Sequence, residues 1–119
     1  MIYPLSSLAP SVNAMYVARG RYRYKTKEYC AWLVRAMSEL KRWPPFNCDK
    51  FSCDIRVPYC LKDRSDIDNR IKGTLDIFVK AKLIPDDRHC MDLRIRYVKE
   101  TQQNKVEVEF LEVDENNLK

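Results

Sequence analysis

The chain has 119 residues, of which 45% are hydrophobic and 33% are charged, and it contains only two glycines. This length and composition suit one folded domain with a modest core, and they argue against an intrinsically disordered chain. The formal net charge of +5 favours a polyanionic partner, with nucleic acid first and a membrane surface second.

Five cysteines are present, and their odd number and their spacing argue against a disulfide framework or a zinc site. We interpret them as reduced thiols. The N-terminus lacks the basic region and the long apolar run of a signal peptide, and no stretch approaches the roughly 20 apolar residues that a membrane span requires. The sequence therefore predicts a cytoplasmic protein with no membrane partner.

The first part of the chain predicts a short strand, an exposed loop and a helix. Residues 1–8 hold a possible edge strand, which Pro4 weakens. Residues 9–26 form a long loop or an irregular hairpin that contains the basic run RGRYRYKTK. A helix is expected from Lys27 to about Arg42, because Thr26 can cap its start and two prolines stop it. Its apolar face comprises Tyr29, Trp32, Leu33, Ala36, Leu40 and Trp43.

The second part predicts a strand, a helix and two further strands. Residues 50–60 alternate between apolar and polar side chains, as in a half-buried strand, and Pro58 suggests that this strand lies at an edge or is ending. The helix is expected from Asp66 to Lys82. The inward set of the next strand is Met91, Leu93, Ile95 and Tyr97, and that of the last strand is Val106, Val108 and Phe110.

The connection ETQQNK makes those last two strands a plausible antiparallel hairpin. The element order, with a possible strand at the start, indicates the α+β class. We expect a single small domain with a mixed β-sheet and two main helices packed on it.

Four acids flank the second helix, and two interpretations of them stay open. Asp66 and Asp68 stand at its start, and Asp86 and Asp87 follow its end. In the structural interpretation, Asp66 or the residue before it caps the helix, and Asp68 pairs with Lys72 for about 0.3–0.5 kcal/mol. In the functional interpretation, the acids bind a metal ion.

Whether these acids meet depends on the path of the chain after the helix. If the next strand returns antiparallel along the helix, Asp86 and Asp87 lie at the far end from Asp66. If that strand starts beside the end of the 50–60 strand, all the acids gather. The residues alone leave both paths open.

Acids that do gather would repel one another, and a cation resolves that repulsion. Mg²⁺ prefers oxygen ligands and binds through a few carboxylates plus a substrate phosphate, where it can activate a water molecule. Lys72 lies one turn beyond Asp68 and could contact the scissile phosphate. Asp76, one further turn along, is expected to be a solvated or supporting acid.

The run Asp66-Ile67-Asp68-Asn69, followed by Lys72, Asp76 and an Asp86-Asp87 pair before an alternating strand, resembles the RusA family of Holliday junction resolvases. The resemblance is strongest over residues 64–99, and a looser match covers Pro10 to Arg42 and the last strand. It implies one RusA-like endonuclease domain over residues 1–119. It also implies a Mg²⁺-dependent homodimer, with Mn²⁺ as an alternative ion, that cuts four-way DNA junctions by paired symmetric nicks without a small-molecule cofactor.

The resemblance also implies roles for individual residues. Asp66, Asp68 and Asp87 match the family's catalytic, metal-binding acids, and Lys72 matches its catalytic lysine. The implied fold brings Asp87 to the start of the helix, with Asp86 as the less essential member of its pair.

The sequence departs from the family pattern at three places. The usual glycine after the helix is Lys82, Ser65 replaces a frequent basic residue before the first acid, and only Asn13 remains of two expected asparagines.

The basic run in the first loop predicts a DNA contact. Its cations can contact phosphates, and the interleaved Tyr22 and Tyr24 can stack on bases. In the alternative, the run is a solvated hairpin whose tyrosines pack on the core. The residues expected to contact DNA are Asn13, Arg19, Arg21, Arg23, Lys25, Lys27 and Arg64.

Two functions therefore follow from the sequence. The first is a metal-dependent endodeoxyribonuclease that is selective for branched DNA. The second is a non-catalytic nucleic-acid-binding module in which the acids serve only as caps and turn residues.

Overall fold

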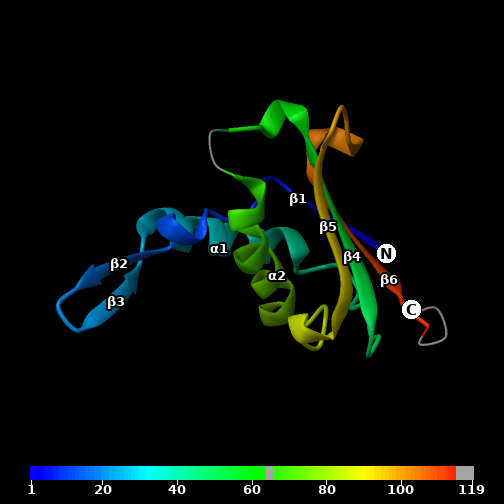
Figure 1. Ribbon diagram of the computed structural model, residues 1–119, viewed down its shortest axis with the longest axis horizontal. Helices are drawn as coiled ribbons and strands as arrows, with labels where there is room; N and C mark the ends of the chain where they lie inside the picture. The colour runs from blue at the N-terminus through cyan, green and yellow to red at the C-terminus, as the bar shows by residue number, and fades with distance from the viewer. Residues whose placement is uncertain (64–65, 115–119) are drawn as a thin grey trace.

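The computed structural model describes residues 1–63 and 66–114. Its main sheet contains β1 (Ile2–Leu5), β6 (Val106–Glu112), β4 (Phe51–Pro58) and β5 (Cys90–Val98), in that spatial order. A separate hairpin is formed by β2 (Tyr16–Arg19) and β3 (Tyr22–Lys25), and the main helices are α1 (Lys27–Leu40) and α2 (Ile71–Lys80). Figure 1 shows both helices on one side of the sheet and the hairpin projecting away from it. The expected α+β class with a mixed sheet is confirmed.

Strand β4 is an interior strand of the main sheet. It pairs antiparallel with β6 and parallel with β5. Its alternating pattern sends Phe51, Cys53, Ile55 and Val57 into the core. An edge position for this strand is therefore wrong, and Pro58 marks its end, where a missing N–H costs no interior ladder bond.

The expected antiparallel hairpin between the last two strands is wrong. β4 lies between β5 and β6, and β5 runs parallel to β4. Parallel neighbours need a crossover connection, and α2 supplies it. The short ETQQNK segment connects β5 to β6, which are two positions apart in the sheet. A short connection therefore did not mean that the two strands are paired.

Strand β5 forms an edge of the sheet, and its predicted inward set is only partly buried. Leu93 and Ile95 pair with the buried Cys53 and Ile55, so they do lie on the helix side of the sheet. Ile95 packs against the core, but Leu93 and Met91 are exposed. An alternating pattern identifies the face of a strand but does not show whether a helix covers it.

Helix α1 forms nearly as expected, with its end at Leu40 rather than Arg42. The Thr26 Oγ1 accepts a hydrogen bond of 3.1 Å from the backbone N of Tyr29, which makes Thr26 the N-cap. The residues of the predicted apolar face that are buried are Tyr29, Trp32, Ala36 and Leu40. Trp43 lies beyond the helix and is partly exposed, with its ring edge-on to Tyr3.

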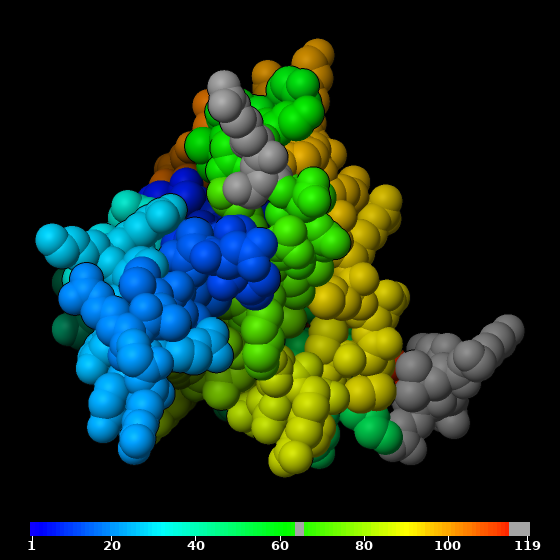
Figure 2. Space-filling view, turned by 60° about the vertical axis from the view of Figure 1, so that its left-hand side comes forward, coloured from blue at the N-terminus to red at the C-terminus, as the bar shows by residue number. Residues whose placement is uncertain are grey.

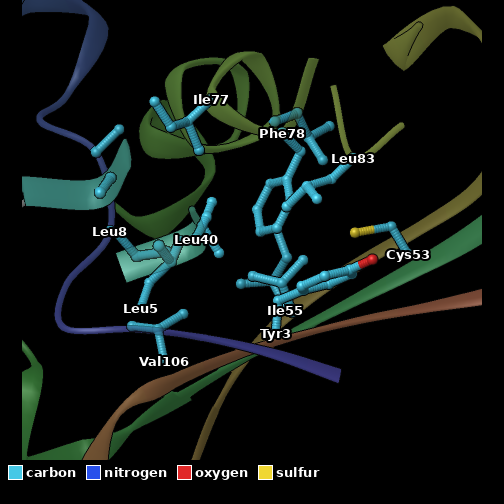
Figure 3. Close-up of a cluster of buried hydrophobic side chains, with 14 of the residues drawn as sticks. Tyr3, Leu5, Leu8, Leu40, Cys53, Ile55, Ile77, Phe78, Leu83 and Val106 are labelled. Carbon is cyan, nitrogen blue, oxygen red and sulfur yellow. The ribbon is translucent and has the colours of Figure 1, made fainter. Parts of the chain in front are cut away.

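The core fills the space between the sheet and the two helices. Figure 3 shows Tyr3 and Ile55 from the sheet facing Phe78 from α2 and Leu83 from the turn after it. The rings of Tyr3, Phe78 and Phe110 meet edge to face, at centroid distances of 5.1 to 5.8 Å. No helix in the part of the chain that the structure describes is long and apolar enough to cross a membrane.

Helix α2 begins later than expected. A 3₁₀ turn, η3, occupies Ile67–Arg70, and α-helical geometry starts at Ile71. The helix ends at Lys80, and the chain then reverses at Lys82, whose φ is +60°. The backbone N of Leu83 donates to the carbonyl of Phe78, as in a left-handed helix cap. Lys82 thus adopts a left-handed conformation at the position where the resemblance predicts a glycine.

We predict that Lys82→Gly stabilises the protein. A side chain in the left-handed region costs roughly 1 kcal/mol, and glycine carries no such cost. Urea unfolding should show a free energy of unfolding about 0.5–1 kcal/mol higher than that of the wild type.

Lys82→Ala is the matched control, because it removes the same charged side chain but keeps the Cβ atom. We expect no gain from it. Equal stabilisation by both substitutions would mean that the lysine side chain, and not the backbone conformation, causes the strain.

Candidate active site

The start of α2 is fixed in place by the segment that precedes the hairpin. The backbone N of Ala9 donates a 3.1 Å hydrogen bond to Oγ1 of Thr74, which is fully buried. A Cβ atom at Gly73 would lie 2.0 Å from Cε of Met15 and 2.8 Å from Cβ of Ala9. The helix therefore approaches this segment at a distance that only glycine permits. This packing and this hydrogen bond also fix the backbone positions of the residues next to Gly73 and Thr74.

Lys72 is one of those residues, and its ammonium group joins two acids. Its Nζ lies 2.7 Å from Oδ2 of Asp87 and 3.0 Å from Oδ1 of Asp76. Its hydrogen bond to Asp87, followed by the one to Asp76, raises the pKa of Lys72 well above its ordinary value, so the group is charged at neutral pH. The expected pair between Asp68 and Lys72 is replaced by the pair with Asp76, on the other side of the lysine.

The path of the chain after α2 is the first of the two considered above, because β5 runs parallel to β4 and therefore antiparallel to the crossover helix that joins them. Cys90, the first residue of β5, pairs with Phe51, so β5 starts beside the start of β4. The 3₁₀ turn η4 (Asp87–His89) contacts α2 itself. Figure 1 shows this turn next to the helix. Asp87 therefore reaches the site through its contact with Lys72, without any contact between the start of β5 and the end of β4.

Asp86 has a structural role in this turn. Its Oδ1 accepts a 3.0 Å hydrogen bond from the backbone N of Arg88, and its Oδ2 lies 3.1 Å from Nε of the same residue. The backbone hydrogen bond lowers the pKa of Asp86. The carboxylate of Asp86 thus caps η4, while that of Asp87 is turned toward Lys72.

Asp66 and Asp68 are both accessible at the entrance to the helix. Asp66 is the N-cap residue of η3, but its side chain makes no capping hydrogen bond. Asp68 lies in the first turn of η3. Both carboxylates can therefore be reached by a ligand from solvent. Arg64 and Ser65, which precede them in the sequence, lie outside the described residues.

The three matched acids have the donor chemistry of a site for a hard divalent cation, because each supplies carboxylate oxygens. Among residues 1–63 and 66–114, however, no group of three or more His, Cys, Asp or Glu side chains is close enough to hold a metal ion. A shared metal site for Asp66, Asp68 and Asp87 stays a prediction. What the structure places together is Asp87, Lys72 and Asp76.

The basic run forms the β2–β3 hairpin. Both strands are exposed along their whole length, as is Asn13 in the 3₁₀ turn before them. The hairpin is anchored at its base, where Thr26 N donates to the carbonyl of Met15 and the Thr26 Oγ1 donates to that of Ala14. Figure 2 shows the hairpin (blue), α2 (green) and the turn before β5 (yellow-green) on one face of the molecule.

Sequence reasoning missed two features of this face. It did not identify the ion pair between Arg70 and Asp63, which joins η3 to the segment before it. It also did not identify Gly73 as a packing residue. The signal was present, because a glycine within a predicted helix usually has a packing or functional reason.

Comparison with known proteins identifies the family of the chain. Residues 7–110 match the family model described as Endodeoxyribonuclease RusA. The matched segment includes the hairpin, both helices and every acid of the candidate site. No curated protein matches the chain. Because the family model covers most of the sequence, the chain belongs to the RusA endodeoxyribonuclease family.

Proposed function

We propose that this protein is a metal-dependent, structure-selective endodeoxyribonuclease that resolves four-way DNA junctions by paired symmetric nicks. The contact between Lys72 and Asp87 carries the proposal, because it joins two family positions that the sequence leaves 15 residues apart. Membership of a DNA-cleaving family supports the same function. We treat residues 1–119 as one such domain.

Asp66, Asp68 and Asp87 are the proposed ligands of a divalent cation, Mg²⁺ in the first place and Mn²⁺ as an alternative. When bound, such an ion supplies charge neutralisation at the phosphate and a more acidic water. Asp66 and Asp68 offer accessible carboxylates, and Asp87 is held in position by Lys72.

The ammonium group of Lys72 has one N–H donor that neither Asp76 nor Asp87 uses, and this donor is available to the substrate. An ammonium group has three N–H donors, and Asp87 and Asp76 accept from it in the structure. The side chain is 65% exposed, so the third donor can reach a phosphate oxygen from solvent. We propose that Lys72 positions Asp87 and also stabilises negative charge on the scissile phosphate.

The hairpin is the proposed contact with the DNA backbone. Residues 1–27 carry five cations and no acid, whereas the remaining 92 residues carry 17 cations and 17 acids. The whole net charge therefore resides in the segment that contains the hairpin. Phosphate contacts of this kind recognise backbone and shape and carry little sequence information. Arg64 and Asn13 complete the proposed DNA-binding set.

A homodimer is the proposed assembly. A four-way junction presents two strands related by twofold symmetry, and a C₂ dimer presents one site to each of them. Sedimentation analysis of the purified protein tests this assembly. We also propose a cytoplasmic location, because the five cysteines are all free thiols and a reducing compartment keeps them so.

Asp68→Asn should abolish cleavage of a synthetic four-way junction and leave junction binding intact. The amide keeps the shape of the carboxylate but removes its charge. Cleavage is followed on labelled junctions with Mg²⁺ or with a chelator, and binding is followed by gel shift in chelator.

The matched control is Asp49→Asn, which makes the same charge change at an exposed acid before β4. It should cut at the wild-type rate. Full activity of Asp68→Asn would refute the assignment. Wild-type protein that binds the junction but leaves it uncut with Mg²⁺ would favour the non-catalytic module.

Lys72→Met should lower the rate of junction cleavage by about 100-fold or more, because a positioned charge at a reacting phosphate contributes several kcal/mol. Single-turnover kinetics with saturating protein measure the rate without the binding step. Lys80→Met removes an exposed lysine from the last turn of the same helix and should change the rate less than twofold. Equal effects of the two substitutions would show that Lys72 acts only through net charge.

Substituting Gln for hairpin cations should weaken binding to all DNA forms and reduce its salt dependence. Removal of one phosphate contact lowers the slope of log K against log salt by about 0.9 for duplex DNA. The combined change of Arg19, Arg21 and Lys25 to Gln is compared with Arg42→Gln, an exposed arginine beyond α1. An unchanged salt slope in the triple variant would place the DNA-binding surface elsewhere.

A further inference from the structure

The two faces of the β2–β3 hairpin differ in what they contact. Side chains that are directly opposite in an antiparallel pair share a face. Tyr16 opposite Lys25 and Ala18 opposite Arg23 make one face. Tyr16 packs against Tyr29 of α1 at a ring distance of 5.8 Å, and Arg23 lies 4.6 Å from the centre of the Tyr16 ring. This face is therefore partly occupied by contacts within the chain.

The other face carries Tyr24 opposite Val17 and Tyr22 opposite Arg19. We call these four residues the tyrosine face. Tyr22 is 65% exposed and Tyr24 is 52% exposed, and their ring centroids are 6.2 Å apart. The two rings are tilted against each other by 48° and leave most of their surface to solvent. A hollow beside them is lined by Val17, Tyr24 and the cations that flank them.

The charge around the tyrosine face indicates what covers it. All five charged residues among residues 1–27 are cations, so a neutral or basic protein surface would gain nothing electrostatically here. A polyanion with accessible aromatic surface fits both properties. Nucleic acid is such a partner, because its phosphates meet the cations and its bases stack on tyrosine rings.

We propose that the tyrosine face stacks on nucleobases that a branch point leaves unpaired or poorly stacked, and that this contact makes the protein prefer branched over linear DNA. In linear duplex, each base is covered by its neighbours, so a tyrosine ring can reach a base face only after unstacking it. At a branch point, that cost is smaller. The inference rests on the DNA-binding part of the proposed function, and it does not depend on the acids.

The base of the hairpin holds the tyrosine face in a fixed relation to the candidate active site. Met15 immediately precedes β2, and its side chain fills the space above Gly73 in α2. The hydrogen bond from Ala9 to Thr74 adds a second link between the same segments. Stacking at a branch point would therefore orient the DNA relative to Lys72, on the adjoining helix. Figure 2 shows the hairpin and α2 on the same face of the molecule.

The test compares wild type with the double variants Tyr22→Ala/Tyr24→Ala and Tyr22→Phe/Tyr24→Phe. Binding is measured in chelator, so that cleavage does not interfere. The probes are a four-way junction and a linear duplex of the same arm sequence, with 2-aminopurine beside the branch point to report stacking. Sedimentation of each variant reports its oligomeric state.

The alanine variant should bind the junction about tenfold or more weakly, since stacking on one base is worth roughly one tenfold step in binding. Its affinity for duplex should change less than twofold. The phenylalanine variant should keep the junction affinity and the 2-aminopurine signal, because the ring and not the hydroxyl makes the contact.

Equal weakening on junction and duplex would overturn the proposal, and so would failure of phenylalanine to replace tyrosine. A change of oligomeric state in the alanine variant would assign the tyrosine face to a second copy of the chain instead. The cleavage assay with Mg²⁺ is scored separately. A wild-type protein that prefers junctions through its tyrosines but does not cut them would retain this inference and refute the nuclease.

Discussion

The parallel pairing of β4 with β5 is the constraint on which the arrangement of this site depends. Two parallel neighbours cannot be joined by a tight turn, so the chain must travel back along the sheet before β5 begins. The ten residues of α2 make that return, over about 15 Å. The acids at the two ends of the helix are separated by this crossover. Lys72 closes part of that gap, since its long side chain reaches Asp87 from the first turn of the helix.

A second constraint connects the hairpin with the same helix. Thr74 is the only buried polar residue of the described chain, and its hydroxyl satisfies the backbone of Ala9 while donating to the carbonyl of Arg70. An unpaired amide at Ala9 would carry the full cost of its burial. The segment before the hairpin is therefore attached to α2 by a hydrogen bond whose removal would be strongly destabilising. The hairpin, which is the proposed DNA contact, and the candidate catalytic helix are thus attached to the same segment.

The sequence predicted which segments form helices and strands better than it predicted which strands pair with each other. The alternation of residues 50–60 identified β4, and the helical spacing around Trp32 identified α1, because both patterns depend on local burial. The same alternation in β5 did not reveal that its neighbour is β4 rather than β6. Pairing partners depend on the path of the whole chain, and periodicity does not distinguish between two strands with the same pattern.

The residues of the candidate site were predictable from the sequence, but the contacts between them were not. The residue types and their spacing identified Asp66, Asp68, Lys72 and Asp87, and the family resemblance implied that Asp87 approaches the start of the helix. The partner of Lys72 was not predictable, because Asp68 and Asp76 lie equally far from it along the helix. The choice of Asp76 follows from the position of Asp87, which draws the ammonium toward the same side.

The net positive charge lies in residues 1–27, so the charge distribution of the molecule is asymmetric. Its longest dimension is 49 Å, whereas electrostatic forces decay over about 8 Å at physiological salt. A polyanion within about one such length of the surface is therefore attracted mainly by the end that carries the net charge, and very little by the charge-balanced remainder. Rotational diffusion during the approach is biased, so that the end bearing the hairpin arrives first. The encounter is thus pre-oriented before any short-range contact forms.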